Sequence, residues 1–82
     1  MSESSQLELA SLDPMLAGII RDNGEQVAGW MSGQPGCWGF LAGKAVVACR
    51  ALLGRALTGG ERRLVWSRLW WWLEQVKARA LC

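Results

Sequence analysis

The sharpest break in the helical patterning of this chain is Ser32-Gly33-Gln34-Pro35-Gly36. Two glycines and a proline in so short a stretch end one helix and permit a tight reversal of the chain. Apolar residues recur at helical spacing on both sides of this break. It therefore predicts that one helix ends near residue 32 and that the next begins near residue 37.

The pattern before the break predicts an amphipathic helix over residues 14–32. Asp13-Pro14 is typical of a helix start, because a carboxylate at the N-cap accepts from free backbone N–H groups and proline has no N–H to leave unpaired. Asn23-Gly24 should weaken or bend this helix at its centre. Residues 1–12 are expected to form a flexible lead-in, with at most a short extra turn. The apolar stripe of the helix consists of Leu16, Ile19, Ile20, Val27, Trp30 and Met31.

The pattern after the break predicts a second helix over residues 37–57. Three glycines, Gly39, Gly43 and Gly54, cluster on a second side of this helix, and inside a helix each costs about 1 kcal/mol relative to alanine. Because these positions lack a side chain, we expect another helix, mostly one from the same chain, to pack closely there. The broad apolar face consists of Trp38, Leu41, Ala42, Ala45, Val46, Cys49, Leu52, Leu53 and Ala56.

A third helix is predicted over residues 59–80, because Thr58-Gly59-Gly60-Glu61 has the Thr-x-x-Glu spacing of a capping box. Helices with one apolar face each bury those faces by packing together. The fold expected is therefore all-α, a small three-helix bundle that spans residues 13–82. The apolar face of the third helix consists of Val65, Trp66, Leu69, Trp70, Trp72, Leu73, Val76 and Ala80.

The composition suits one small folded domain, since the chain has 82 residues, of which 51% are hydrophobic and 20% are charged. The charges are unevenly distributed. Residues 1–25 carry five acids and one base, whereas residues 44–82 carry eight bases and two acids. Two interpretations follow: the acidic part docks beside the basic remainder of the same molecule, or the basic half faces an acidic partner.

Residues suited to catalysis or metal binding are few. The chain has no histidine, and its three cysteines, Cys37, Cys49 and Cys82, do not form the paired Cys-x-x-Cys of a zinc site. Residues 39–44 depart from a phosphate-binding loop in spacing and in the residue after the lysine. We therefore expect no enzyme, no metal, no cofactor and no small-molecule substrate. The odd cysteine count, the polar opening and the lack of a long apolar run favour the cytoplasm.

Six tryptophans are the least average feature of the composition. Successive helical residues turn by about 100°, so Trp71 should point outward if Trp70 and Trp72 flank the buried face. An exposed strip on the third helix would then consist of Leu64, Arg68, Trp71 and Gln75. Tryptophan and arginine are the residues most enriched at binding hot spots.

Three functions are compatible with these features. The first is a small non-catalytic module for protein–protein interaction, an accessory subunit or a homo-oligomer, that buries the strip against another chain. The second is peripheral binding to an anionic membrane surface through the Trp- and Arg-rich third helix. The third is a helix-turn-helix-like binder of nucleic acid. It is disfavoured because tryptophans stand where base-reading polar residues belong and because the net charge is only +2.

Overall fold

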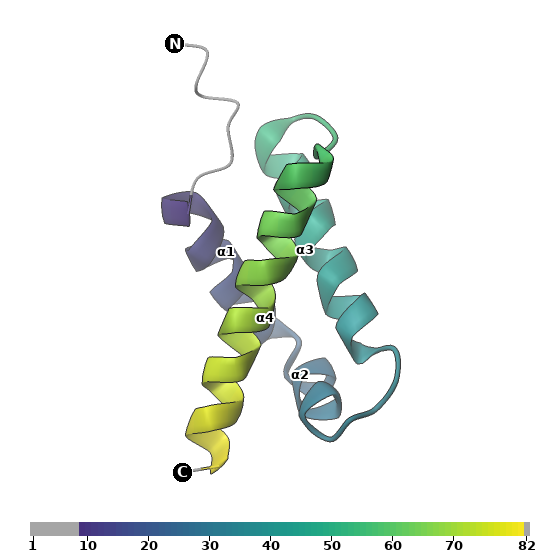
Figure 1. Cartoon of the computed structure of the whole chain (residues 1–82), viewed down its shortest axis with the longest axis vertical. Coiled ribbons are helices and arrows are strands. Elements are labelled where there is room, and N and C mark those ends of the chain that lie inside the picture. Colours follow the sequence, from purple (N-terminus) through teal and green to yellow (C-terminus); the bar gives the residue numbers. More distant parts are fainter. Residues whose placement is uncertain (1–8, 82) are drawn as a thin grey trace.

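The computed structural model describes residues 9–81, which contain four helices joined by short connections (Figure 1). They are α1 (Leu9–Asp22), α2 (Gly24–Met31), α3 (Cys37–Leu53) and α4 (Gly59–Leu81). No strand occurs in this part of the chain, so the predicted all-α class is confirmed. The long helix α4 packs against both α1 and α3, and α2 lies beside the N-terminal end of α3. The expected three-helix arrangement thus exists in α1, α3 and α4, with α2 as a short addition.

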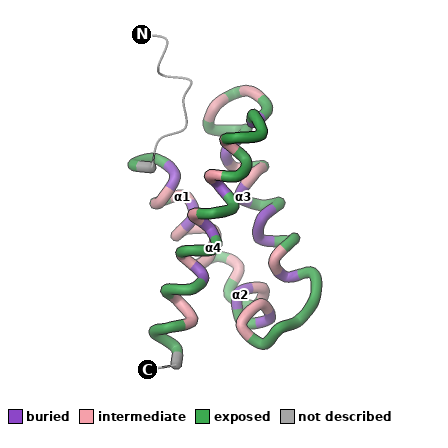
Figure 2. Tube along the Cα trace, viewed as in Figure 1, coloured by how far each residue is buried: buried purple, intermediate pink, exposed green. Residues whose placement is uncertain are grey.

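The core lies where α1, α3 and α4 face one another (Figure 2). Its members recur every three or four residues on each helix, as an apolar stripe requires. The side chains with no exposed surface are Leu12 and Leu16 of α1, Leu41, Ala45 and Cys49 of α3, and Val65, Leu69 and Leu73 of α4. On α3 and α4 these residues belong to the predicted apolar faces.

The first predicted helix differs from the structure at its start. The helix start predicted at Asp13-Pro14 is wrong, since α1 begins at Leu9 and contains Pro14 in its second turn. Leu12 is helical and fully buried, so the lead-in ends before this residue. Residues 1–8 of the expected lead-in lie outside the described residues.

The same predicted helix is also interrupted in its middle. At Asn23 the chain leaves the helical conformation, with a φ of −124° and a ψ of 48°, and so separates α1 from α2. The side-chain amide of Asn23 donates to the carbonyl of Ile19 at 2.8 Å, which ties the break to the end of α1. The weak point expected at Asn23-Gly24 is therefore a complete break.

The predicted turn at residues 32–36 is confirmed, and Gly33 and Gly36 adopt positive φ angles of 81° and 88°. This turn brings Cys37, at the start of α3, against Gly29 of α2. A Cβ on Gly29 would lie only 2.5 Å from the sulfur of Cys37. The close helix contact of this fold is therefore made at Gly29, a residue that the sequence pattern did not single out.

The glycines of the second predicted helix do not pack against the rest of the chain. The helix ends at Leu53, and Gly54 caps it in the left-handed conformation at a φ of 73°. A Cβ on Gly39 or Gly43 would meet no atom within 4 Å. Within residues 9–81, no helix of the same chain therefore approaches these positions, contrary to the expectation of close packing.

The capping box predicted at the start of α4 is present. The backbone N–H of Thr58 donates to Oε1 of Glu61 at 2.9 Å, and the N–H of Glu61 donates to Oγ1 of Thr58 at 3.1 Å. The guanidinium of Arg55 donates to both oxygens of the same carboxylate, at 2.8 Å to Oε1 and 2.7 Å to Oε2. One carboxylate therefore holds together the turn between α3 and α4.

Replacing Thr58 by alanine is expected to lower the free energy of unfolding by about 0.5–2 kcal/mol, because the N–H of Glu61 loses its acceptor. Chemical denaturation followed by circular dichroism measures this loss. Ser67→Ala is the matched control, since Ser67 is exposed inside α4 and caps nothing. Equal midpoints for the two variants would contradict the cap.

The Glu61 carboxylate should also make stability depend on pH. Hydrogen bonds from Arg55 and then from the Thr58 backbone lower the pKa of Glu61 from 4.5 to about 2. A pKa depressed by folding adds stability above the unfolded value, and this stability is lost as the pH falls from 4.5 towards 2.

The melting temperature of Glu61→Gln should therefore fall less over this acidic range than that of the wild type, because glutamine does not titrate. Thermal melts at stepped pH test this, with Glu74→Gln as the control for an exposed carboxylate on the same helix. Parallel curves for the wild type and Glu61→Gln would contradict the prediction.

Candidate functional site

The strip predicted on α4 is only partly exposed. Trp71 and Gln75 lie at the surface, but Leu64 packs against the core and Arg68 is half-buried. The guanidinium of Arg68 lies over the ring of Trp71, 4.5 Å from its centroid. The strip therefore offers a partner two exposed side chains and not four.

Arg68 is bound within the chain by Asp13 of α1. Its Nε and Nη2 donate to the two carboxylate oxygens at 3.1 and 2.9 Å, and the indole of Trp72 donates to Oδ1 at 3.2 Å. The hydrogen bond from Arg68, helped by Trp72 and opposed by burial, holds the pKa of Asp13 below its ordinary value. For this pair, the acidic part of the chain does dock beside the basic part.

Large apolar side chains are exposed on α3 and on the neighbouring side of α4. Val47 is 62% exposed and Trp66 is 39% exposed, and Phe40, Leu52 and Trp70 are exposed as well. The prediction that Trp66 and Trp70 belong to the buried face is wrong, since both are exposed. They follow Val65 and Leu69 by one residue, or about 100° around the helix, and this places them beyond the edge of the core.

Trp70 joins an aromatic cluster at the end of this side. It makes edge-to-face contacts with Trp30 of α2 and Trp38 of α3, and in each pair the ring centroids are 5.3 Å apart. Lys77 lies over the ring of Trp30 at 5.6 Å. The contact with Trp70 holds the ring of Trp38 in place.

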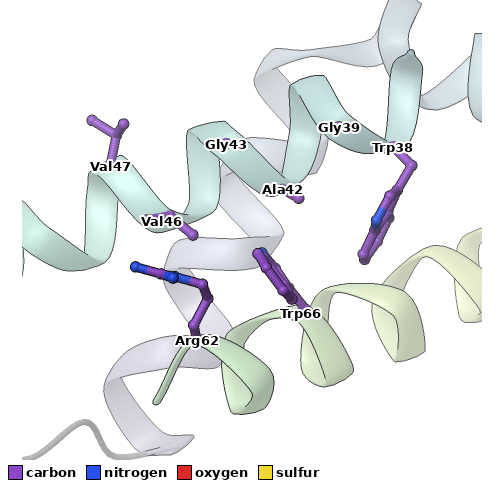
Figure 3. Close-up of a pocket in the computed structure, with 8 residues that line it drawn as sticks. All are labelled: Trp38, Gly39, Ala42, Gly43, Val46, Val47, Arg62 and Trp66. Atoms are coloured by element: carbon purple, nitrogen blue, oxygen red, sulfur yellow. The ribbon is translucent and has the colours of Figure 1, made fainter. Parts of the chain in front are cut away.

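A groove of about 530 Å³ lies between α3 and α4 (Figure 3). Trp38 and Val46 project from α3 towards α4, and Arg62 and Trp66 project from α4 towards α3. Val47 also lines the groove, and its side chain points away from α4. We call this surface the α3–α4 groove. It is lined by Trp38, Gly39, Ala42, Gly43, Val46, Val47, Arg62 and Trp66.

The two glycines that no helix of the chain covers lie in this groove. Gly39, Gly43 and Val47 are each exposed and follow one another at a spacing of four residues, so they share one side of α3. The sequence signal for this surface is the glycine spacing, which predicts packing mostly inside the molecule. The pattern gave no reason to add Val47 or Arg62 to it.

The charges around the α3–α4 groove are positive. Arg62 lines it, Arg50 is exposed on α3, and Arg63 is exposed beside Arg62. None of these three arginines takes part in an ion pair among residues 9–81. Helix α3 contains no acidic residue, and Glu61 at the start of α4 is bound by Arg55. The surface is therefore apolar with a cationic rim.

The described residues hold no arrangement typical of a metal site or of an activated nucleophile. No three or more Cys, Asp or Glu side chains between residues 9 and 81 gather closely enough to bind a metal ion. Cys37 and Cys49 are free and buried. Burial, with a smaller contribution from the charge of Glu61, raises the pKa of Cys49 to about 11, so this thiol is protonated at neutral pH.

The helices of residues 9–81 also include none with the length and apolarity needed to cross a bilayer. Comparison with protein-family models, with curated proteins and with solved structures found no match to this chain.

Proposed function

We propose that this protein is a small non-catalytic helical module that binds another protein, and that the α3–α4 groove is its docking surface. The observation that carries the proposal is the exposure of Val47 and Trp66 on the two sides of an apolar groove. Exposed apolar patches with polar edges are typical of interaction sites, and tryptophan is typical of their hot spots. Two buried free cysteines suit a reducing compartment such as the cytoplasm.

The groove replaces the strip on α4 as the proposed docking surface. In the strip, Arg68 forms an ion pair with Asp13, and Leu64 packs against the core. In the groove, Arg62 has no carboxylate partner among the described residues, and Gly39 and Gly43 leave open space. A partner that binds the groove would therefore disrupt no contact that holds the fold together.

Site-specific photo-crosslinking in the native cell tests this proposal. A photoreactive phenylalanine derivative at Val47 should give a covalent adduct with a partner protein. The same group at Gln75, exposed in the strip, is the control and should give none. Adding Trp66→Ala should abolish the adduct at Val47 without loss of helicity. An adduct at Gln75 alone, or at neither position, would contradict docking in the groove.

Peripheral membrane binding is the second candidate, and one observation favours it. Exposed Trp66 shares its side of the molecule with Arg62, and a surface helix with both residue types suits an anionic membrane interface. Under this function the wild type should sediment with vesicles that contain phosphatidylserine, less so at high salt and less so as Trp66→Ala. Absence of sedimentation at low salt would eliminate it.

A further inference from the structure

We infer that the segment that occupies the α3–α4 groove is an acidic amphipathic α-helix of a partner protein. This inference rests on the proposed docking function and names the chemistry of the occupant. It follows from the shape of the groove and from the charge of its rim.

The shape fits a helix. From Gly39 to Val47 the groove follows α3 for about two turns, or about 12 Å at the helical rise. No side chain stands at Gly39 or Gly43, so another helix can approach α3 closely there. An amphipathic helix presents apolar residues one and two turns apart, which matches this length. Binding by addition of a strand needs a sheet edge, and residues 9–81 contain no strand.

The charge of the rim selects an acidic occupant. Arg62 lies in the groove and Arg50 lies one turn beyond Val46, and neither has a carboxylate partner in the described structure. A second copy of this chain is disfavoured, because a two-fold contact on this side would bring the cations of both α3 helices together without any acidic residue on α3. Glutamates or aspartates beside the apolar face of the partner helix would complement the rim.

Two synthetic peptides provide the direct test. Each has about 18 residues, or five helical turns, with leucine and alanine on one face. One peptide carries glutamate at the flanking positions and the other carries lysine there. We expect the acidic peptide to bind the full chain about tenfold more tightly than the basic one, since each exposed ion pair contributes up to about fivefold. The preference should shrink as salt is added.

Nuclear magnetic resonance locates the binding. The amide signals of Gly39 and Gly43 and the indole signal of Trp66 should shift with the acidic peptide. Those of Gly18 and Gly24, which lie in α1 and α2, should not. Shifts confined to α1 and α2 would overturn the inference.

Charge reversal tests the role of the rim. Arg62→Glu should weaken the acidic peptide about tenfold and improve binding of the basic peptide, because the reversed side chain repels glutamate and attracts lysine. Arg79→Glu is the matched control with the same change in net charge, placed in the last turn of α4 away from the groove, and should alter neither affinity.

Filling the groove tests its shape. Gly43→Leu should remain folded, with an equal or higher melting temperature, because a Cβ there meets no atom and leucine favours helix more than glycine does. The same variant should weaken the acidic peptide at least tenfold. If Gly43 had only a structural role, the variant would not combine an unchanged or higher melting temperature with weaker peptide binding.

The inference and the proposed function fail in different ways. The inference of an acidic helix would be overturned by equal binding of the two peptides, by no binding of either, or by an unchanged preference in Arg62→Glu. In each of these cases, a crosslinked adduct at Val47 would still support the proposed docking of a protein in the groove. If the crosslinked partner were a second copy of this chain, the inference that the groove binds an acidic helix of another protein would also be overturned.

Discussion

Replacing Leu69 by alanine is expected to lower the free energy of unfolding by about 2–5 kcal/mol. Leu69 has no exposed surface and lies on the face of α4 that meets α1 and α3. The truncation removes buried methyl groups and leaves a cavity that the surrounding helices fill only in part. Domains of this kind have a total stability of about 5–15 kcal/mol, so the variant should be unfolded to a large extent under mild denaturation. Chemical denaturation measures the loss.

Leu52→Ala is the matched control, because Leu52 is the same residue type and is 54% exposed on α3. Its cost is expected to stay within about 0.5 kcal/mol, as is usual for exposed positions. A loss for Leu69→Ala no larger than that for Leu52→Ala would mean that the core does not lie between these helices.

The sequence predicted which side of α4 faces the core but not how far around the helix the buried face extends. Periodicity identified Val65, Leu69 and Leu73, which are fully buried, because a stripe that recurs every three or four residues faces one side of a helix. It also placed Trp66 on that face, and Trp66 is exposed. Hydrophobicity does not distinguish a side chain that the fold buries from one that another molecule buries. The number and position of the neighbouring helices set the edge of the core.

Local signals succeeded where both partners are near in sequence. Thr58 and Glu61 are three residues apart, and the capping box that they predicted is present. Asp13 gave an equally familiar local signal as a helix cap, but its carboxylate binds Arg68, 55 residues away. An ion pair and an indole hydrogen bond between helices outweigh the cap, and no local pattern carries that information.

The sequence indicated only part of the candidate site, namely its glycines, and did not identify it as a docking surface. Gly39 and Gly43 predicted that another helix, mostly one of the same chain, packs closely on α3, because glycine in a helix interior otherwise only costs stability. The described part of the chain leaves both positions uncovered. The spacing of the glycines does not say whether the chain itself covers them, and only the structure adds Val47 and Arg62 to the same surface.

Asp13→Ala is expected to lower the free energy of unfolding by about 1–3 kcal/mol. The carboxylate receives two hydrogen bonds from Arg68 and one from Trp72, and less than a third of either side chain of the ion pair is exposed. Hydrogen bonds to charged groups contribute more than neutral ones, and truncation leaves the half-buried guanidinium without its partner. Since this contact joins α1 to α4, its loss should loosen the docking of α1.

The exposed neighbouring pair of Arg21 and Asp22 supplies the control. Its side chains are 78% and 69% exposed, and such pairs contribute little, so Asp22→Ala should change stability by less than about 0.5 kcal/mol. A double-mutant cycle of Asp13→Ala with Arg68→Ala should give a coupling energy of at least 0.5 kcal/mol, as is typical of residues in one hydrogen-bond network.

Because folding lowers the pKa of Asp13 below 3.8, the stability that this carboxylate adds is present above that pH and is lost as the solution becomes more acidic. The difference between wild type and Asp13→Ala should therefore be greatest near neutral pH and shrink in acid. A difference that grows in acid, or additive single variants, would show that Asp13 does not hold α1 to α4.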